Sequence, residues 1–101
     1  MVVYQTARFQ VRPEQLAVAQ QAIRDFVEYV RENEPGTRLY SSIHETEDET
    51  TFLHYFIFED EAAQNTHRSS EGVMRFTEIL YPTLVDGVQF TEYRLLASTD
   101  Q

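Results

Sequence analysis

The sequence contains no cysteine among its 101 residues, and this absence excludes several kinds of site at once. A disulfide framework, a thiolate zinc site and a cysteine nucleophile all need that residue. Glycine is scarce, at three residues, and the sequence has no glycine-rich phosphate-binding loop. No apolar run approaches the roughly 18 residues that a membrane span requires. The first residues lack the basic and apolar regions of a signal peptide, so we expect a cytoplasmic protein.

Lysine is absent as well, so all eight basic residues are arginines, and 17 acidic residues bring the net charge to −9. The arginines are scattered along the chain, with acidic residues near each of them. Nucleic-acid binding needs a clustered basic surface, and attraction to an anionic membrane needs the same. We therefore expect neither nucleic acid nor a membrane as a partner.

The hydrophobic pattern predicts a single domain over residues 1–101 that alternates strands and helices. The segments that read as strands are residues 2–11, 37–46, 51–58 and 88–97. Residues 14–33 form a predicted amphipathic helix, because apolar side chains recur there at steps of three and four. Pro35 cannot continue this helix, and Gly36 permits a positive φ in the turn that follows.

Two shorter helices are predicted in the second half of the chain. Asp60 is a favourable N-cap for the first of them, which contains His67. Ser69 and Ser70 separate it from the second, which carries Phe76 on its apolar side. The resulting order, β-α-β-β-α-β, is that of ferredoxin-like α+β domains, in which helices cover one face of an antiparallel sheet.

The predicted strand over residues 51–58 is apolar on both of its faces. If Phe56 faces the helices, then Tyr55 and Ile57 face outward, or the reverse, and the sequence does not decide between them. A sheet so apolar on its open face would aggregate, and each exposed large side chain forgoes roughly 1.5–3 kcal/mol of burial. We therefore expect a second copy to cover that face in a face-to-face homodimer.

Four local patterns extend over nearly the whole chain. They are the strand end Ala7-Arg8-Phe9-Gln10-Val11-Arg12-Pro13, the turn Glu34-Pro35-Gly36 with Tyr40 after it, the stretch Phe58-Glu59-Asp60-Glu61-Ala62-Ala63 followed by His67 and Ser70, and Phe76 followed by Leu80-Tyr81-Pro82. In their order and spacing the chain resembles the antibiotic biosynthesis monooxygenase family of dimeric α+β barrels.

The resemblance implies a dimer whose two sheets form a barrel, with a pocket in each subunit between its own sheet and helices. It also implies oxidation of electron-rich aromatics, such as quinols or anthrones, by molecular oxygen without a metal or flavin cofactor. A haem-degrading branch of the family carries other residues at the positions of Ala7, His67 and Thr77, which disfavours haem degradation here. Many relatives also have a glutamate where this chain has Phe56.

Two histidines are the candidate catalytic residues. His67 is predicted on the second helix, facing the sheet, where an imidazole of unperturbed pKa about 6.5 suits a phenolic proton. The alternative is a structural histidine that bonds a backbone carbonyl. His54 shares that pocket if its strand face looks toward the helices, and otherwise lies at the dimer interface. A metal site built on both histidines is a third possibility, although the helical i−4 neighbour of His67 is Ala63, which is no ligand.

The candidate substrate-binding residues are apolar and belong to several elements: Phe9, Phe26, Phe56, Phe76 and Leu80. Together they would line a pocket for a small, flat, mostly apolar aromatic ligand. A plain hydrophobic core fits the same residues. The predicted function is a cofactor-independent monooxygenase; the alternatives are a non-catalytic small-molecule-binding or stress-associated protein of the same fold, and a pure assembly module.

Overall fold

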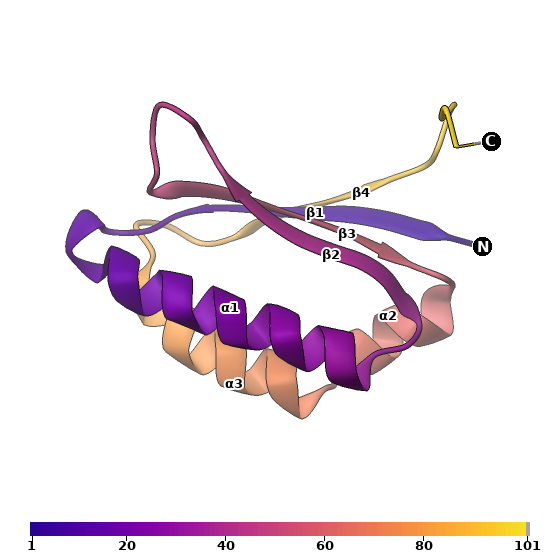
Figure 1. Cartoon of the computed structure of the whole chain (residues 1–101), viewed down its shortest axis with the longest axis horizontal. Helices are drawn as coiled ribbons and strands as arrows, with labels where there is room; N and C mark the ends of the chain where they lie inside the picture. Colours follow the sequence, from indigo (N-terminus) through magenta and orange to yellow (C-terminus); the bar gives the residue numbers. More distant parts are fainter. Residues whose placement is uncertain (101) are drawn as a thin grey trace.

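A four-stranded antiparallel sheet, covered on one face by helices, forms the fold (Figure 1). The structure, a computed structural model, describes residues 1–100. The strands are β1 (Val3–Gln10), β2 (Thr37–His44), β3 (Thr51–Phe58) and β4 (Gln89–Tyr93), in the order β2-β3-β1-β4. The helices are α1 (Leu16–Asn33), α2 (Glu61–Arg68) and α3 (Glu71–Leu80), with 3-10 turns at Pro13–Gln15 and Tyr81–Thr83. The predicted ferredoxin-like α+β fold is confirmed.

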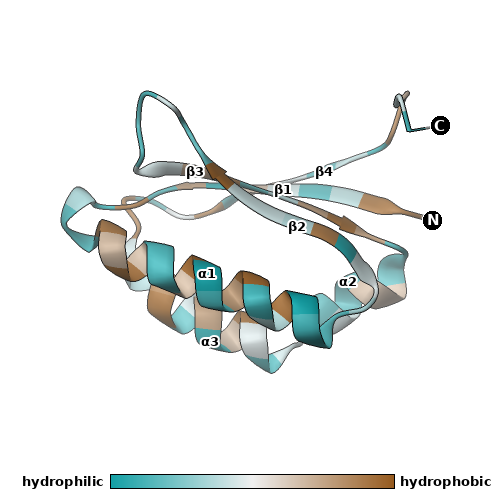
Figure 2. Ribbon diagram, viewed as in Figure 1, coloured by the Kyte–Doolittle hydropathy of each residue, from teal (hydrophilic) through white to brown (hydrophobic). Residues whose placement is uncertain are grey.

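Helix α1 is amphipathic, and Figure 2 shows its hydrophilic and hydrophobic bands alternating. Its buried residues recur at helical spacing: Ala19, Ala22, Ile23, Phe26 and Val30. The helix begins at Leu16 rather than at residue 14, because Pro13–Gln15 form a tighter 3-10 turn first. No helix within residues 1–100 is both long and apolar enough to cross a membrane.

Side-chain caps start the two short helices, the predicted cap Asp60 for α2 and Ser70 for α3. The Asp60 carboxylate accepts the backbone N–H of Ala63 at 2.8 Å, and the Ser70 hydroxyl accepts that of Val73 at 3.0 Å. Each bond satisfies a donor that a helix N-terminus otherwise leaves unpaired. Asp60 thereby fixes the start of α2 and the direction in which that helix presents His67.

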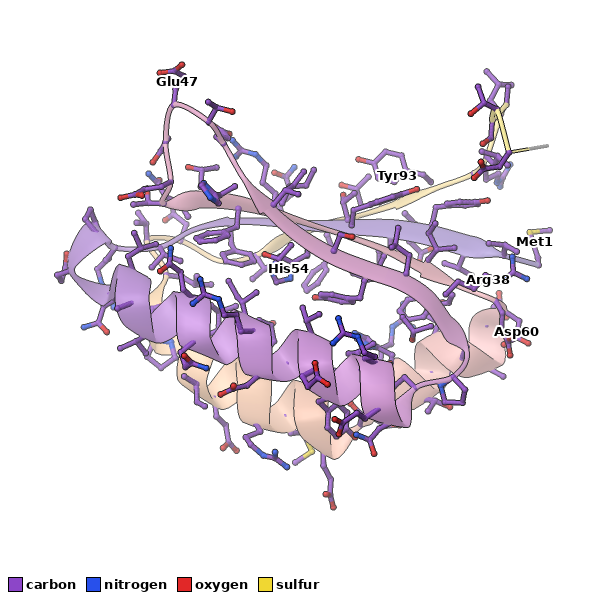
Figure 3. All side chains as sticks on the ribbon, viewed as in Figure 1. Met1, Arg38, Glu47, His54, Asp60 and Tyr93 are labelled. Atoms are coloured by element: carbon purple, nitrogen blue, oxygen red, sulfur yellow. The ribbon has the colours of Figure 1, made fainter. Side chains whose placement is uncertain are left out.

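Strand β3 turns one of its two apolar faces toward the helices. Phe52, His54, Phe56 and Phe58 are each at most 4% exposed, whereas Tyr55 is 36% exposed on the opposite face. Figure 3 shows His54 on the helix side of the sheet and Tyr93 on the other side. The outer face carries a set of exposed apolar side chains, which we call the outer apolar face: Leu39, Ile43, Tyr55 and Tyr93.

Three further local predictions were wrong. Strand β4 ends at Tyr93 rather than at residue 97. Tyr93 pairs with Tyr4, and β1 begins only one residue before Tyr4, so residues after Tyr93 have almost no strand left to pair with. Strand β2 ends at His44 rather than at residue 46, since the next residue already bonds back across the turn to Thr51. Gly36 does not have a positive φ. Its role is spatial, because a Cβ there would lie 2.6 Å from the Cβ of Ala63.

Candidate functional site

A cavity of about 470 Å³ lies between the sheet and the helices. All seven residues singled out from the sequence line it: His54, His67, Phe9, Phe26, Phe56, Phe76 and Leu80. The structure therefore brings the candidate catalytic and substrate-binding residues to one place, while the roles assigned to them remain predictions. A volume of this size lies within the range of small-molecule sites, which are mostly apolar with a few placed polar groups.

Flat aromatic rings form the walls of the cavity. On the helix side, the rings of Phe26 and Phe76 stack with centroids 4.4 Å apart and an interplanar angle of 2°. On the sheet side, Tyr40 stacks on Phe56 at 4.9 Å and 13°. Such rings offer large, rigid apolar surface, which favours a flat aromatic ligand over a branched or strongly charged one.

His67 reaches the cavity from α2, and its two ring nitrogens are in different surroundings. The Nδ1 atom lies 2.7 Å from Oε1 of Glu34. Within residues 1–100 the Nε2 atom makes no hydrogen bond, and it is not among the buried unpaired atoms. Since the side chain lines the cavity, Nε2 is free to meet a ligand there.

Glu34 supplies a buried carboxylate beside His67. The residue follows α1 and is 5% exposed, and its backbone N–H bonds the carbonyl of Val30 at 3.0 Å. Its Oε1 also accepts a hydrogen bond from Thr37 Oγ1 at 2.9 Å, whereas Oε2 is buried with no partner in residues 1–100. Burying a carboxylate costs free energy, and the hydrogen bonds that Thr37 and His67 make to Oε1 offset part of that cost.

His54 and Tyr40 form a second, neutral polar pair, with Nδ1 and the hydroxyl oxygen 2.7 Å apart. Burial lowers the pKa of His54 to about 4. Burial, followed by the nearby Glu34 and Tyr81, raises the pKa of Tyr40 well above its usual range. Both groups are therefore neutral near pH 7. Nδ1 of His54 is the one acceptor that the Tyr40 hydroxyl meets in residues 1–100, so we assign the O–H as the donor, which leaves the proton of the His54 ring on Nε2, a buried atom without a partner there.

One end of the cavity is polar. The side-chain amide of Gln64 donates to Gln5 Oε1 at 3.1 Å and to Glu92 Oε1 at 2.7 Å. Arg68 also donates to Glu92 Oε1, at 3.4 Å. These residues come from α2, β1 and β4, and all of them line the cavity. The cavity therefore suits a ligand with an apolar aromatic body and polar substituents at one end.

The metal site considered from the sequence finds no support in the side-chain arrangement. Within residues 1–100 no group of three histidine, aspartate or glutamate side chains is placed to hold a metal ion. The Nδ1 atoms of His54 and His67 already face Tyr40 and Glu34, respectively.

The sequence analysis missed the site role of Glu34, which it treated only as part of a helix stop. The only local signal is an acidic residue directly before Pro35 and Gly36, and that pattern is common in turns. Gln64 was missed as well, because polar residues at that spacing on a helix usually face solvent. The partners of both residues lie on other elements, so spacing along one segment could not reveal them.

The profile of the family described as "Antibiotic biosynthesis monooxygenase" matches residues 2–78 of this chain. No protein of curated function matches the sequence.

Several solved structures have the same fold. A protein of Mycobacterium tuberculosis superposes with a TM-score of 0.89 at 19% identity, over 98% of this chain and 99% of its own. A protein of Caulobacter crescentus, named provisionally as an antibiotic biosynthesis monooxygenase, gives 0.89 at 17% identity over 95% of this chain and 91% of its own. A Pseudomonas aeruginosa protein gives 0.84 at 22% identity over 95% of both chains. At these identities the likeness establishes the fold alone.

Proposed function

The chain belongs to the antibiotic biosynthesis monooxygenase family, and we propose that it is a cofactor-independent monooxygenase. The proposed substrate is an electron-rich aromatic of the quinol or anthrone type, bound between the sheet and the helices. One observation carries this proposal: an aromatic-walled cavity of about 470 Å³ contains the imidazole of His67, whose Nδ1 is bonded to a buried carboxylate. A pure assembly module has no need of such a cavity.

In the proposed reaction, His67 Nε2 accepts the acidic proton of the bound substrate. The deprotonated ring then donates electrons to molecular oxygen, which is the oxidant. For an anthrone, the methylene carbon loses two hydrogens and gains one oxygen atom as a carbonyl, while the second oxygen atom leaves as water. The protein contributes orientation, exclusion of water and a proton acceptor.

His54 is assigned a binding role in this scheme rather than that of a base. Its pKa of about 4 makes it a weak proton acceptor near neutral pH. Its Nε2 is buried, without a partner in residues 1–100 and without exposed surface toward the cavity, so His54 contributes a neutral ring to the cavity wall rather than a hydrogen bond to the ligand. The proposed substrate therefore carries an ionisable hydroxyl near His67 and places an apolar ring against His54 and its aromatic neighbours.

We propose further that the protein is a cytoplasmic homodimer that buries the outer apolar face. Ile43 is 56% and Tyr93 is 52% exposed on this face, which is too much large apolar surface to leave in water on a sheet. The helices cover the other face, so a second copy of the sheet is the simplest cover.

Oxygen consumption with a panel of quinols and anthrones tests the proposed activity. We expect turnover by the wild type and a loss of about 100-fold or more in His67→Ala. His44→Ala removes an exposed imidazole on β2 and serves as the matched control, which should retain wild-type turnover. Equal rates for wild type and His67→Ala would exclude His67 as the proton acceptor. Binding of the panel without turnover by any variant would favour the ligand-binding alternative.

A further inference from the structure

Glu34 and His67 form a buried pair that joins the turn after α1 to helix α2. Oε1 of Glu34 lies 2.7 Å from Nδ1 of His67, and the side chains are only 3% and 11% exposed, respectively. We propose that Glu34 is a positioning residue that holds His67 in the tautomer with its proton on Nδ1. This inference rests on the proposed role of His67 as the proton acceptor, and it assigns to Glu34 a part in the same reaction.

The hydrogen bonds at Oε1 define the direction of the Glu34–His67 contact. Thr37 Oγ1 already donates to Oε1 at 2.9 Å, so this oxygen serves as an acceptor. When its ring is neutral, His67 can satisfy such an oxygen only by donating a proton from Nδ1. The same ring then carries a lone pair on Nε2, which is the form that a general base needs.

The surroundings of His67 leave Nε2 for the ligand. The ring of Phe58 is 5.1 Å from that of His67, and the ring of Phe26 is 5.6 Å away, and neither offers a hydrogen-bonding group. Within residues 1–100 no side chain or backbone group bonds Nε2, whereas the residue lines the cavity. The pair therefore has one bonded end, at Glu34, and one open end toward the ligand.

The burial of Glu34 is difficult to explain by packing alone. Its Oε2 is buried and has no partner in residues 1–100, so the carboxylate is only partly compensated where it lies. A glutamine or an apolar residue of similar size would avoid that cost. Unlike a glutamine or an apolar side chain, a carboxylate can only accept a hydrogen bond from Nδ1. It therefore determines which ring nitrogen of His67 carries the proton.

The first experiment measures the tautomer directly in the ligand-free protein. Two-bond ¹H–¹⁵N correlation spectra distinguish a proton on Nδ1 from one on Nε2, and they are recorded at the high-pH plateau of the His67 signals. We expect Nδ1–H in the wild type, and in Glu34→Asp, which keeps a carboxylate. In Glu34→Gln the amide can donate to Nδ1, so a substantial population should carry the proton on Nε2. Glu32→Gln, an exposed change in the last turn of α1, is the matched control and should resemble the wild type.

Two results of this measurement would overturn the proposal. One is a wild-type ring that carries its proton on Nε2, and the other is an unchanged tautomer in Glu34→Gln. If Glu34→Gln does not fold, the spectra of the wild type and of Glu34→Asp still test the proposal. The proposal requires that His67 carry its proton on Nδ1 in both proteins.

The second experiment uses turnover of a quinol or anthrone that the wild type oxidises. We expect Glu34→Gln to lower kcat by about 100-fold and to change KM by less than about threefold, with partial recovery in Glu34→Asp. Wild-type kcat in Glu34→Gln would overturn the positioning role even if the tautomer had changed. If the wild type oxidises no substrate, the monooxygenase proposal fails, and the spectra still report whether Glu34 determines the tautomer.

Discussion

A Cβ atom on Gly36 would lie 2.6 Å from the Cβ of Ala63, so the turn after α1 and the first turn of α2 touch without room for a methyl group. Glu34 is on the first of these segments, and His67 is one helical turn beyond Ala63 on the second. The absence of a side chain at Gly36 therefore permits the close approach that brings the carboxylate to Nδ1 of His67.

Gly36→Ala should destabilise the protein because the new methyl group must displace α2. We expect a loss of about 1–3 kcal/mol in the free energy of unfolding, measured by urea denaturation at fixed protein concentration. Gly87→Ala is the matched control, since a Cβ there meets no atom within 4 Å, and it should be neutral or slightly stabilising. An equal loss in both variants would show that the contact with Ala63 is not the cause.

His54 should make stability depend on pH in acid. Its pKa is lowered by burial from 6.5 to about 4 in the folded protein, so the unfolded chain binds the extra proton more readily. The stabilisation is therefore complete above about pH 6.5 and is lost as the pH falls toward 4, by about 3 kcal/mol in total. Urea denaturation at a series of pH values should show this loss in the wild type and a smaller one in His54→Gln.

Carboxylates titrate over part of the same pH range, so the contribution of His54 is measured as the difference in pH-dependent stability between the wild type and His54→Gln. His44→Gln removes an exposed imidazole from the adjacent strand and controls for the loss of a histidine. If that control lost the same pH dependence as His54→Gln, the assignment to His54 would be wrong.

Phe76 and Phe90 both line the cavity but should contribute differently to folding and to binding. Phe76 is 9% exposed and stacks on Phe26, so Phe76→Ala should cost about 3 kcal/mol of stability. Phe90 is 56% exposed, so Phe90→Ala should leave stability nearly unchanged and weaken binding of an anthrone about fivefold. Calorimetric titration with the anthrone measures the second effect. Unchanged binding in Phe90→Ala would place the ligand away from β4.

Hydrophobic periodicity was sufficient to predict the architecture, whereas the face of β3 that meets the helices was left open. The bounds of β3 were predicted correctly, and the step of two along it places His54 and Phe56 on one face because β-strand geometry fixes that alternation. The end of β4 depends on where β1 begins, and the pairing of Glu34 with His67 depends on the packing of Gly36 against α2. Such relationships join residues far apart in the chain, and no local pattern encodes them.

The outer apolar face gives the last prediction, which concerns association. Ile43 is 56% exposed on that face, so in a face-to-face dimer a charge placed there would lose water. Ile43→Glu places one such charge on each copy, and we expect the dissociation constant of the dimer to rise by at least about 100-fold. Met74→Glu is the matched control, because Met74 is 58% exposed on α3, away from the sheet, and it should remain a dimer. Sedimentation velocity at micromolar concentration distinguishes the two variants. A wild type that sediments as a single chain under these conditions would contradict the proposed dimer, because the outer apolar face would then be stable in water without a second copy.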